Sequence, residues 1–160
     1  MQPLMHIRHS RLAAAVLLIS HAASPLVMAQ SHWSTAILGA LTIEVDFQNA
    51  PPGVNDFRSF VTYSPGGATV EFNGAPGFSP ATGAWEFVRA AEFVATWIKP
   101  VYDQTGAFLG TVKIRGRIQM KSEDEYESRD KIDFILPNGV LAASWTSVVT
   151  GRRIKVEPVD

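Results

Sequence analysis

Apolar and polar residues alternate along most of the chain after position 36. The clearest segment is 107–121, where apolar or small residues occupy the even positions and basic or amide side chains occupy many of the odd ones. A period of two is typical of a β-strand with one buried face. Interrupted by turn sequences rich in Gly, Pro, Asn and Asp, the pattern predicts eight strands, at 37–48, 57–63, 68–73, 83–89, 91–102, 107–121, 126–136 and 140–154.

Eight consecutive strands joined by short turns predict an all-β domain in which sequence neighbours pair antiparallel. A flat sheet of this size would leave two long edges open to aggregation, and closure into a barrel removes both edges. We therefore predict a single eight-stranded antiparallel up-and-down barrel, whose interior is either filled by side chains or holds one small ligand. A sandwich of two sheets is the alternative.

The first 29 residues follow a different pattern. Basic residues precede an apolar run at 12–19, and the small residues Val27 and Ala29 suit a cleavage site after position 29. This order is typical of a secretory signal peptide. The apolar run is too short for a membrane-spanning helix, which needs about 20 residues. We predict a cleaved signal peptide at 1–29 and one domain at 30–160, in an exported protein, periplasmic or secreted, with no membrane span after cleavage.

Histidine and cysteine are nearly absent from the predicted mature chain. His32 would remain alone near the new N-terminus, and the chain has no cysteine. Thiol redox chemistry, His-dependent catalytic triads and His-rich zinc sites therefore lack their residues, so we expect no metal and no cofactor. The net charge of −1 argues against a nucleic-acid partner, which requires a basic stripe.

Several sequence blocks, each a turn with a flanking strand, resemble blocks of small bacterial lipocalin-like and allene oxide cyclase-like barrel proteins. They are FRSFVTY (57–63) followed by PGG (65–67), GAWE (83–86), YDQTGAFLGTV (102–112), and PNGVL (137–141) ahead of GRRI (151–154). Most such proteins have no assigned activity, but relatives in shape include small-molecule carriers and cyclases. The resemblance implies a barrel with a lumen. Where the first strand of these proteins often has Gly-x-Trp, this chain has Gly39-Ala40-Leu41.

The sixth and seventh predicted strands supply the candidate catalytic residues. If their even positions face inward, Tyr126, Ser128 and Asp130 enter the lumen among apolar side chains, with Gly116 leaving open space across from Asp130. Burial among apolar groups raises the pKa of a carboxyl group, which is how a general acid is made. The candidate catalytic residues are Asp130 and Tyr126, and either this carboxyl group or a tyrosine would be the acid. The alternative is that Asp130 meets a backbone amide, an arginine or water near the barrel mouth.

Aromatic residues supply most of the candidate ligand-binding side chains. Three tryptophans fall on inward faces, where they either line an apolar pocket or form plain core. Two tyrosines end their strands, which suggests barrel rims, and one phenylalanine is at the tip of a long loop that suits a lid. The candidate ligand-binding residues are Trp85, Trp97, Trp145, Phe78, Tyr63, Tyr102 and Ser128.

The odd positions of the same two strands are densely charged. Basic side chains on the sixth strand stand beside an alternation of acidic and basic ones on the seventh. This pattern favours a solvated outer face with cross-strand ion pairs over an anion-binding site. The residues are Lys113, Arg115, Arg117, Glu125, Glu127, Arg129, Lys131 and Asp133.

Three functions fit these predictions. The first is an exported binding protein that holds a small apolar or aromatic molecule in its lumen. The second is a metal-independent cyclase or isomerase, of the natural-product ring-forming or allene oxide cyclase-like kind, that shapes its substrate mainly by proximity and restriction and adds one acid. The third is a structural barrel with a filled core that acts through its surface.

Overall fold

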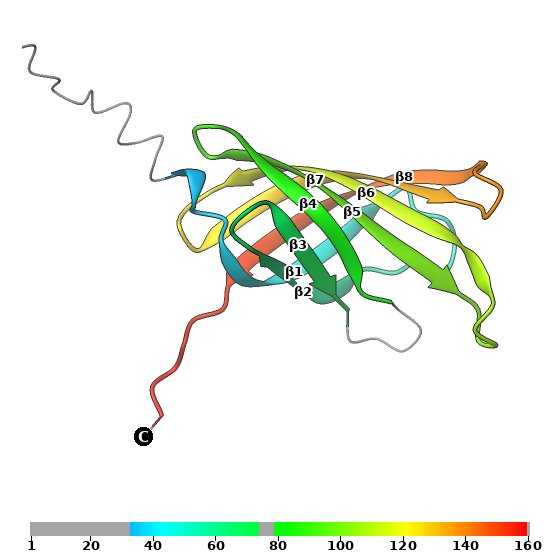
Figure 1. The fold of residues 1–160 in the computed structure, drawn as a ribbon, viewed down its shortest axis with the longest axis horizontal. Helices are drawn as coiled ribbons and strands as arrows, with labels where there is room; N and C mark the ends of the chain where they lie inside the picture. Colours follow the sequence, from blue (N-terminus) through cyan, green and yellow to red (C-terminus); the bar gives the residue numbers. More distant parts are fainter. Residues whose placement is uncertain (1–32, 74–78, 160) are drawn as a thin grey trace, which may run out of the picture.

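The structure, a computed structural model, describes residues 33–73 and 79–159. Eight antiparallel strands form a closed barrel in the order of the sequence, as Figure 1 shows. The strands are β1 (Gly39–Gln48), β2 (Phe57–Tyr63), β3 (Ala68–Phe72), β4 (Ala81–Arg89), β5 (Glu92–Tyr102), β6 (Phe108–Met120), β7 (Glu125–Ile135) and β8 (Leu141–Arg153). The predicted signal peptide, His32 and Phe78 lie outside the described residues.

The last strand closes the barrel on the first. β8 pairs antiparallel with β1 from Leu41↔Arg153 to Gln48↔Thr146, so the sheet has no free edge between them. The prediction of an eight-stranded up-and-down barrel is confirmed, and the sandwich alternative is wrong. All eight predicted strands are present, with ends within two residues of those predicted.

Inward-facing side chains pack the barrel densely at one end, here called the closed end. Aromatic rings contact one another edge to face there: Tyr63 has its ring centroid 6.3 Å from that of Trp85 and 6.3 Å from that of Tyr126, and Phe93 is 5.8 Å from Trp85. Such pairs add to the free energy of plain apolar burial. The core of the protein therefore lies off-centre, toward this end.

A helical turn at residues 33–37 covers the closed end. Ile37 and Leu41 are fully buried in the core cluster that contains these aromatic residues. The guanidinium of Arg153 donates hydrogen bonds to the carbonyls of Ala36, Leu38 and Glu123. This arginine thus joins the N-terminal turn to the β6–β7 turn.

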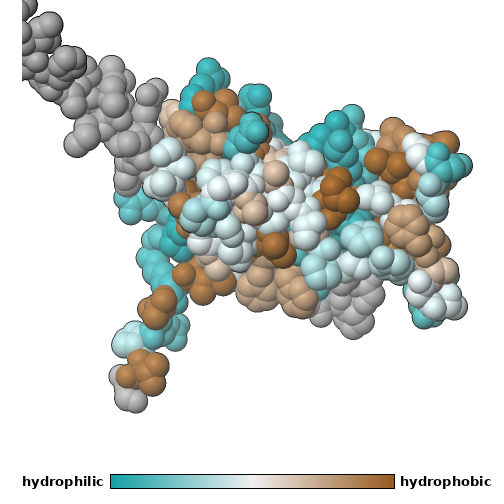
Figure 2. Space-filling view, in the orientation of Figure 1, coloured by the Kyte–Doolittle hydropathy of each residue, from teal (hydrophilic) through white to brown (hydrophobic). Residues whose placement is uncertain are grey.

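The opposite end, here called the open end, is formed by the β1–β2 loop and by the β5–β6 and β7–β8 turns. Apolar side chains on and beside these two turns are exposed to solvent, and Figure 2 shows hydrophobic groups among polar ones at this end of the molecule. The exposed set comprises Tyr102, Phe108, Leu109, Val140 and Leu141. The two ends of the barrel are therefore chemically different.

Candidate functional site

A cavity of about 740 Å³ occupies the open half of the lumen. That volume is within the range of small-molecule sites in proteins. Seven of the eight strands and the β1–β2 loop contribute to its lining, so it is an interior space of the barrel rather than a surface groove. The chain therefore encloses space that its own described side chains do not fill.

The wall nearest the mouth is aromatic and aliphatic. Phe47 on β1 lies with its ring centroid 5.6 Å from that of Phe57 on β2 and 6.4 Å from that of Trp145 on β8. Val112 and Phe134 extend the apolar lining across β6 and β7. Surfaces of this kind bind apolar or aromatic groups by burying their area.

The floor of the cavity is polar and is centred on Asp130. This carboxyl is 8% exposed, and the hydroxyl of Ser128 donates a hydrogen bond to its Oδ1. Burial raises the pKa of Asp130 to about 6, although the Ser128 hydrogen bond lowers it. Asp130 therefore changes its protonation state near neutral pH, as a general acid in an apolar pocket does.

Two further donors of the lining have no hydrogen-bond partner among the described residues. They are the hydroxyl of Ser147, whose residue pairs with Asp130 across β7 and β8, and the indole N–H of Trp145. A buried donor without a partner costs free energy that a suitable acceptor recovers. The β8 side of the cavity is therefore suited to a ligand that brings a hydrogen-bond acceptor.

Gly116 lies directly across from Asp130, as the turn position predicts, but the space there is not empty. A Cβ at Gly116 would stand 2.6 Å from Asp130 Oδ1, 2.9 Å from Ser128 Oγ and 3.2 Å from Trp97 Cζ3. The expectation of open space between Gly116 and Asp130 is therefore wrong. The glycine makes room for Asp130 itself, and the free volume lies nearer the mouth.

A second polar group in the lining is a buried ion pair that the sequence analysis missed. Lys99 on β5 has its Nζ 3.7 Å from Glu71 Oε2 on β3, and the hydroxyl of Ser59 on β2 donates to Glu71 Oε1 at 2.6 Å. Each of the three falls on an inward position of its strand. The alternation that placed Asp130 inside would have placed these residues inside as well.

Two of the other predicted lumen residues, Trp85 and Tyr63, belong to the closed end. Tyr126 and Trp97 line the inner part of the cavity, whereas Trp85 donates its indole N–H to the carbonyls of Ser64 and Ala68 within the packed end. Tyr63 is 1% exposed, and its hydroxyl donates to that of Tyr126 at 3.5 Å. The expectation that Tyr63 sits at a rim within reach of solvent is wrong, because the N-terminal turn covers that end.

Burial also shifts the titration of the two tyrosines. The pKa of Tyr63 is raised well above its ordinary value by burial and by its neighbour Tyr126. Burial likewise raises the pKa of Tyr126, with the nearby Asp130 charge acting in the same direction. Both phenols therefore remain protonated, so Tyr126 can act only as a hydrogen-bond partner or a weak acid.

The third predicted tyrosine faces outward. Tyr102 is 46% exposed at the open end, where its ring packs against that of Phe108 at 5.8 Å, and it does not line the cavity. A bulge between Val101 and Tyr102 shifts the pairing of β5 with β6 at this point. Of the predicted ligand-binding residues, the structure thus brings Trp97, Trp145 and Ser128 together around Asp130.

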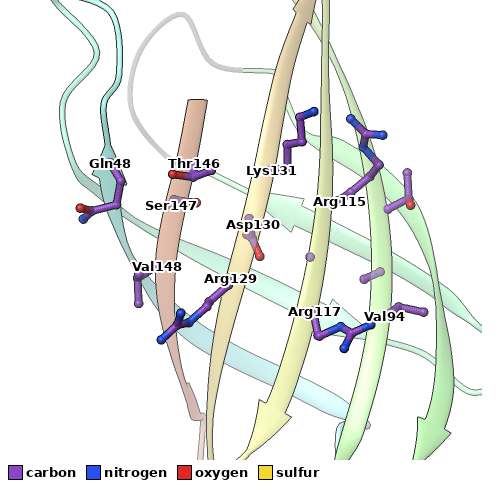
Figure 3. A pocket seen from close by; sticks show the side chains of 13 residues that line it. Gln48, Val94, Arg115, Arg117, Arg129, Asp130, Lys131, Thr146, Ser147 and Val148 are labelled. Atoms are coloured by element: carbon purple, nitrogen blue, oxygen red, sulfur yellow. The ribbon is translucent and has the colours of Figure 1, made fainter. Parts of the chain in front are cut away.

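A second, shallower hollow lies on the outside of the barrel over β5 to β8. Figure 3 shows Arg115, Arg117, Arg129 and Lys131 spread over β6 and β7 around it. Ion pairs join Arg115 to Asp133 and, at 3.1 Å, Arg117 to Glu92. The expectation of a solvated outer face with cross-strand ion pairs is confirmed.

The fold and the site define a closed eight-stranded β-barrel with one packed end and one open, lined cavity. No family model matches the chain, and a search of curated proteins finds no match. Within the described ranges, no three His, Cys, Asp or Glu side chains gather as metal ligands would. None of the helices there has the length and hydropathy to cross a membrane.

Proposed function

We propose that the protein binds a small, largely apolar molecule in the open half of its lumen. The observation that carries this proposal is the cavity of about 740 Å³, with aromatic walls near the mouth and a buried polar floor. A core that acts only as scaffold would be packed to the density of a protein interior, with few voids larger than a water molecule. A cavity of this size therefore speaks against a surface-acting barrel with a filled core.

The lining also constrains the chemistry of the ligand. Phe47, Phe57 and Trp145 favour an aromatic or branched apolar body. The Ser147 hydroxyl and the Trp145 N–H, which have no hydrogen-bond partner among the described residues, favour a ligand acceptor such as a carbonyl or ether oxygen on the β8 side of the cavity. The likeness of several sequence blocks to lipocalin-like barrels, and the N-terminal pattern of a signal peptide, support an exported carrier of such a molecule.

A second candidate is a cyclase or isomerase that uses the same cavity. It is favoured by Asp130, a carboxyl with a pKa raised to about 6 at the floor of an apolar site. In that case the walls hold the substrate in a reactive shape and Asp130 supplies or removes one proton. Asp130→Asn distinguishes the two functions, because it would leave binding in place and abolish turnover.

Blocking the mouth tests the proposed function. Ala143 lines the cavity on β8, whereas its neighbour Ala142 is exposed. We expect the neutral fluorescent probe N-phenyl-1-naphthylamine to bind the parent protein with one saturable site, Ala143→Phe to weaken binding by about tenfold or more, and Ala142→Phe to leave it unchanged. A tenfold loss corresponds to about 1.4 kcal/mol.

Fluorescence titration of the three proteins measures this directly, with circular dichroism to show that each variant is folded. If the parent takes up no probe, or if Ala143→Phe and Ala142→Phe bind it equally well, the lumen is not the binding site and the proposal is wrong.

A further inference from the structure

Lys99 is an unusual residue for the wall of an apolar cavity. It occupies an inward position of β5, two residues beyond Trp97, and its side chain is buried at the edge of the open half. Its Nζ lies 6.0 Å from the centroid of the Phe57 ring. An amine on a long, flexible side chain is thus placed where a ligand in the cavity would contact it.

Glu71 faces the same amine from across the sheet. β4 lies between β3 and β5, and Ala81 on β4 pairs with Glu71. The next residue, Thr82, pairs with Ile98, so Ala81 stands level with Lys99 on the other side. Because the side chain of Ala81 is small, Glu71 and Lys99 can approach each other over β4. Ser59 donates to Oε1 of Glu71, which fixes the carboxylate and leaves Oε2 directed at Lys99. The amine therefore has an oriented proton acceptor 3.7 Å away.

The surroundings of the Lys99 amine lower its basicity. Burial lowers the pKa of Lys99 below its ordinary value, and this effect outweighs the opposing charge and hydrogen bond of Glu71. A lysine desolvated in this way is a better nucleophile at neutral pH. Replacing a buried ion pair by apolar residues is often neutral or stabilising, so stability alone does not account for a pair in this wall.

We propose that Lys99 forms a reversible imine with an aldehyde or ketone whose apolar body lies in the open half of the lumen, and that Glu71 transfers the protons. This inference rests on the proposed function, because the carbonyl compound must first enter the cavity. The lumen would then capture its ligand covalently, and the ligand would be an apolar carbonyl compound.

The step balances without an oxidant or a reductant. Glu71 accepts a proton from the Lys99 ammonium, and the freed lone pair attacks the carbonyl carbon. One of the two protons left on the attacking nitrogen then moves to the carbonyl oxygen, which becomes a hydroxyl group. The nitrogen then forms a double bond to that carbon as the carbon–oxygen bond breaks. The hydroxyl, with the proton returned by Glu71, leaves as water.

Reductive trapping tests the imine. The purified protein is incubated with 2-naphthaldehyde and sodium cyanoborohydride, and peptide mapping by mass spectrometry locates the modified amines. We expect Lys99 to be modified at least about tenfold faster than the exposed Lys131, because binding holds the carbonyl beside the amine. Lys99→Arg, which keeps the positive charge, abolishes the fast modification; Glu71→Gln slows it; and Lys131→Arg leaves it unchanged.

Non-covalent binding is measured in parallel with 2-naphthalenemethanol, which has no carbonyl, by displacement of N-phenyl-1-naphthylamine. Displacement by the alcohol together with fast modification of Lys99 supports the imine. Displacement without preferential modification of Lys99, or modification that persists at the same rate in Lys99→Arg, overturns the imine and leaves lumen binding standing. If neither compound displaces the probe and Lys99 is not preferentially modified, the imine is overturned, whereas lumen binding is overturned only if the probe itself does not bind in the lumen.

Discussion

Asp130 marks the boundary between the packed and the open halves of the lumen. Toward the packed half, Asp130 accepts the Ser128 hydrogen bond and fills the space over Gly116. Toward the open half, it borders the cavity. Its raised pKa follows from this position, since a carboxylate surrounded by apolar side chains loses most of its hydration. The same burial that makes Asp130 a candidate acid must therefore reduce the stability of the fold once the group ionises.

The pH dependence of stability tests this directly. The folded pKa is about 6 against an ordinary value of 3.8, so below about pH 4 the carboxyl is protonated in both the folded and the unfolded chain. Between pH 4 and 6 the unfolded chain loses the proton while the folded chain keeps it, and the stability that the neutral group contributes is lost as pH rises. Two pKa units correspond to about 3 kcal/mol.

Denaturant unfolding of the parent and Asp130→Asn at pH 4 and pH 7 measures this contribution as a difference. The difference matters because hydrogen bonds from Thr105 and Ser144 lower the pKa of Asp103 and Asp133, which gives those groups the opposite pH dependence in both proteins. We expect the stability of the parent relative to the variant to fall by about 2 kcal/mol between the two pH values, since the unfolded carboxyl is already partly ionised at pH 4. Equal pH dependence in the two proteins would show that Asp130 is solvated.

Whether a contact could be predicted from the sequence depends on how many strands separate its two residues. The position of Asp130 opposite Gly116 follows from the turn between β6 and β7, because hairpin register is set locally. The Lys99–Glu71 pair spans β3 to β5, so its geometry depends on the stagger of the whole barrel. The filling of the space over Gly116 depends on side-chain packing, which alternation does not describe.

At the scale of elements, the strands were predictable and the covering of the ends was not. Period-two alternation identifies β1 to β8 because each strand buries one face. The helical turn at 33–37 has no such signal, and it is this turn that converts the end near Tyr63 from a rim into packed core. The strand-end position of a tyrosine therefore could not reveal which end of the barrel was open.

Arg153 provides the test of how this end is held. Its guanidinium donates to carbonyls of the N-terminal turn and of the β6–β7 turn, and hydrogen bonds from charged groups contribute about 1.5–3 kcal/mol. We expect Arg153→Met to lower the free energy of unfolding by about 2–3 kcal/mol. The neighbouring Arg152 is exposed and paired only with Glu125 at 3.4 Å among the described residues, so Arg152→Met should cost less than about 1 kcal/mol.

Urea unfolding of both variants measures the two costs. Similar losses for Arg152→Met and Arg153→Met would mean that the closed end is held by apolar packing alone, with no particular contribution from the arginine.

At the scale of the whole molecule, the interior of the barrel has a packed half and an open half. The aromatic cluster at the closed end supplies the packing that an eight-stranded barrel without cysteines needs, and the open half keeps the space that a ligand requires. Two titratable groups whose pKa values are shifted toward neutrality border that space, Asp130 on the floor and Lys99 on the wall. The central claim is that a ligand occupies the open half and leaves the closed end undisturbed.

The four tryptophans of the chain report on that claim, because they are distributed between the two halves. Trp97 and Trp145 line the cavity, whereas Trp85 and Trp33 pack at the closed end. The measurement is a ¹⁵N–¹H spectrum of the indole N–H groups, assigned with single Trp→Phe variants and recorded while N-phenyl-1-naphthylamine is added. We predict saturable shifts of the Trp145 and Trp97 signals with little change at Trp85 and Trp33. Shifts confined to Trp85 and Trp33, or no shift of any indole signal, would contradict a ligand site in the open half of the lumen.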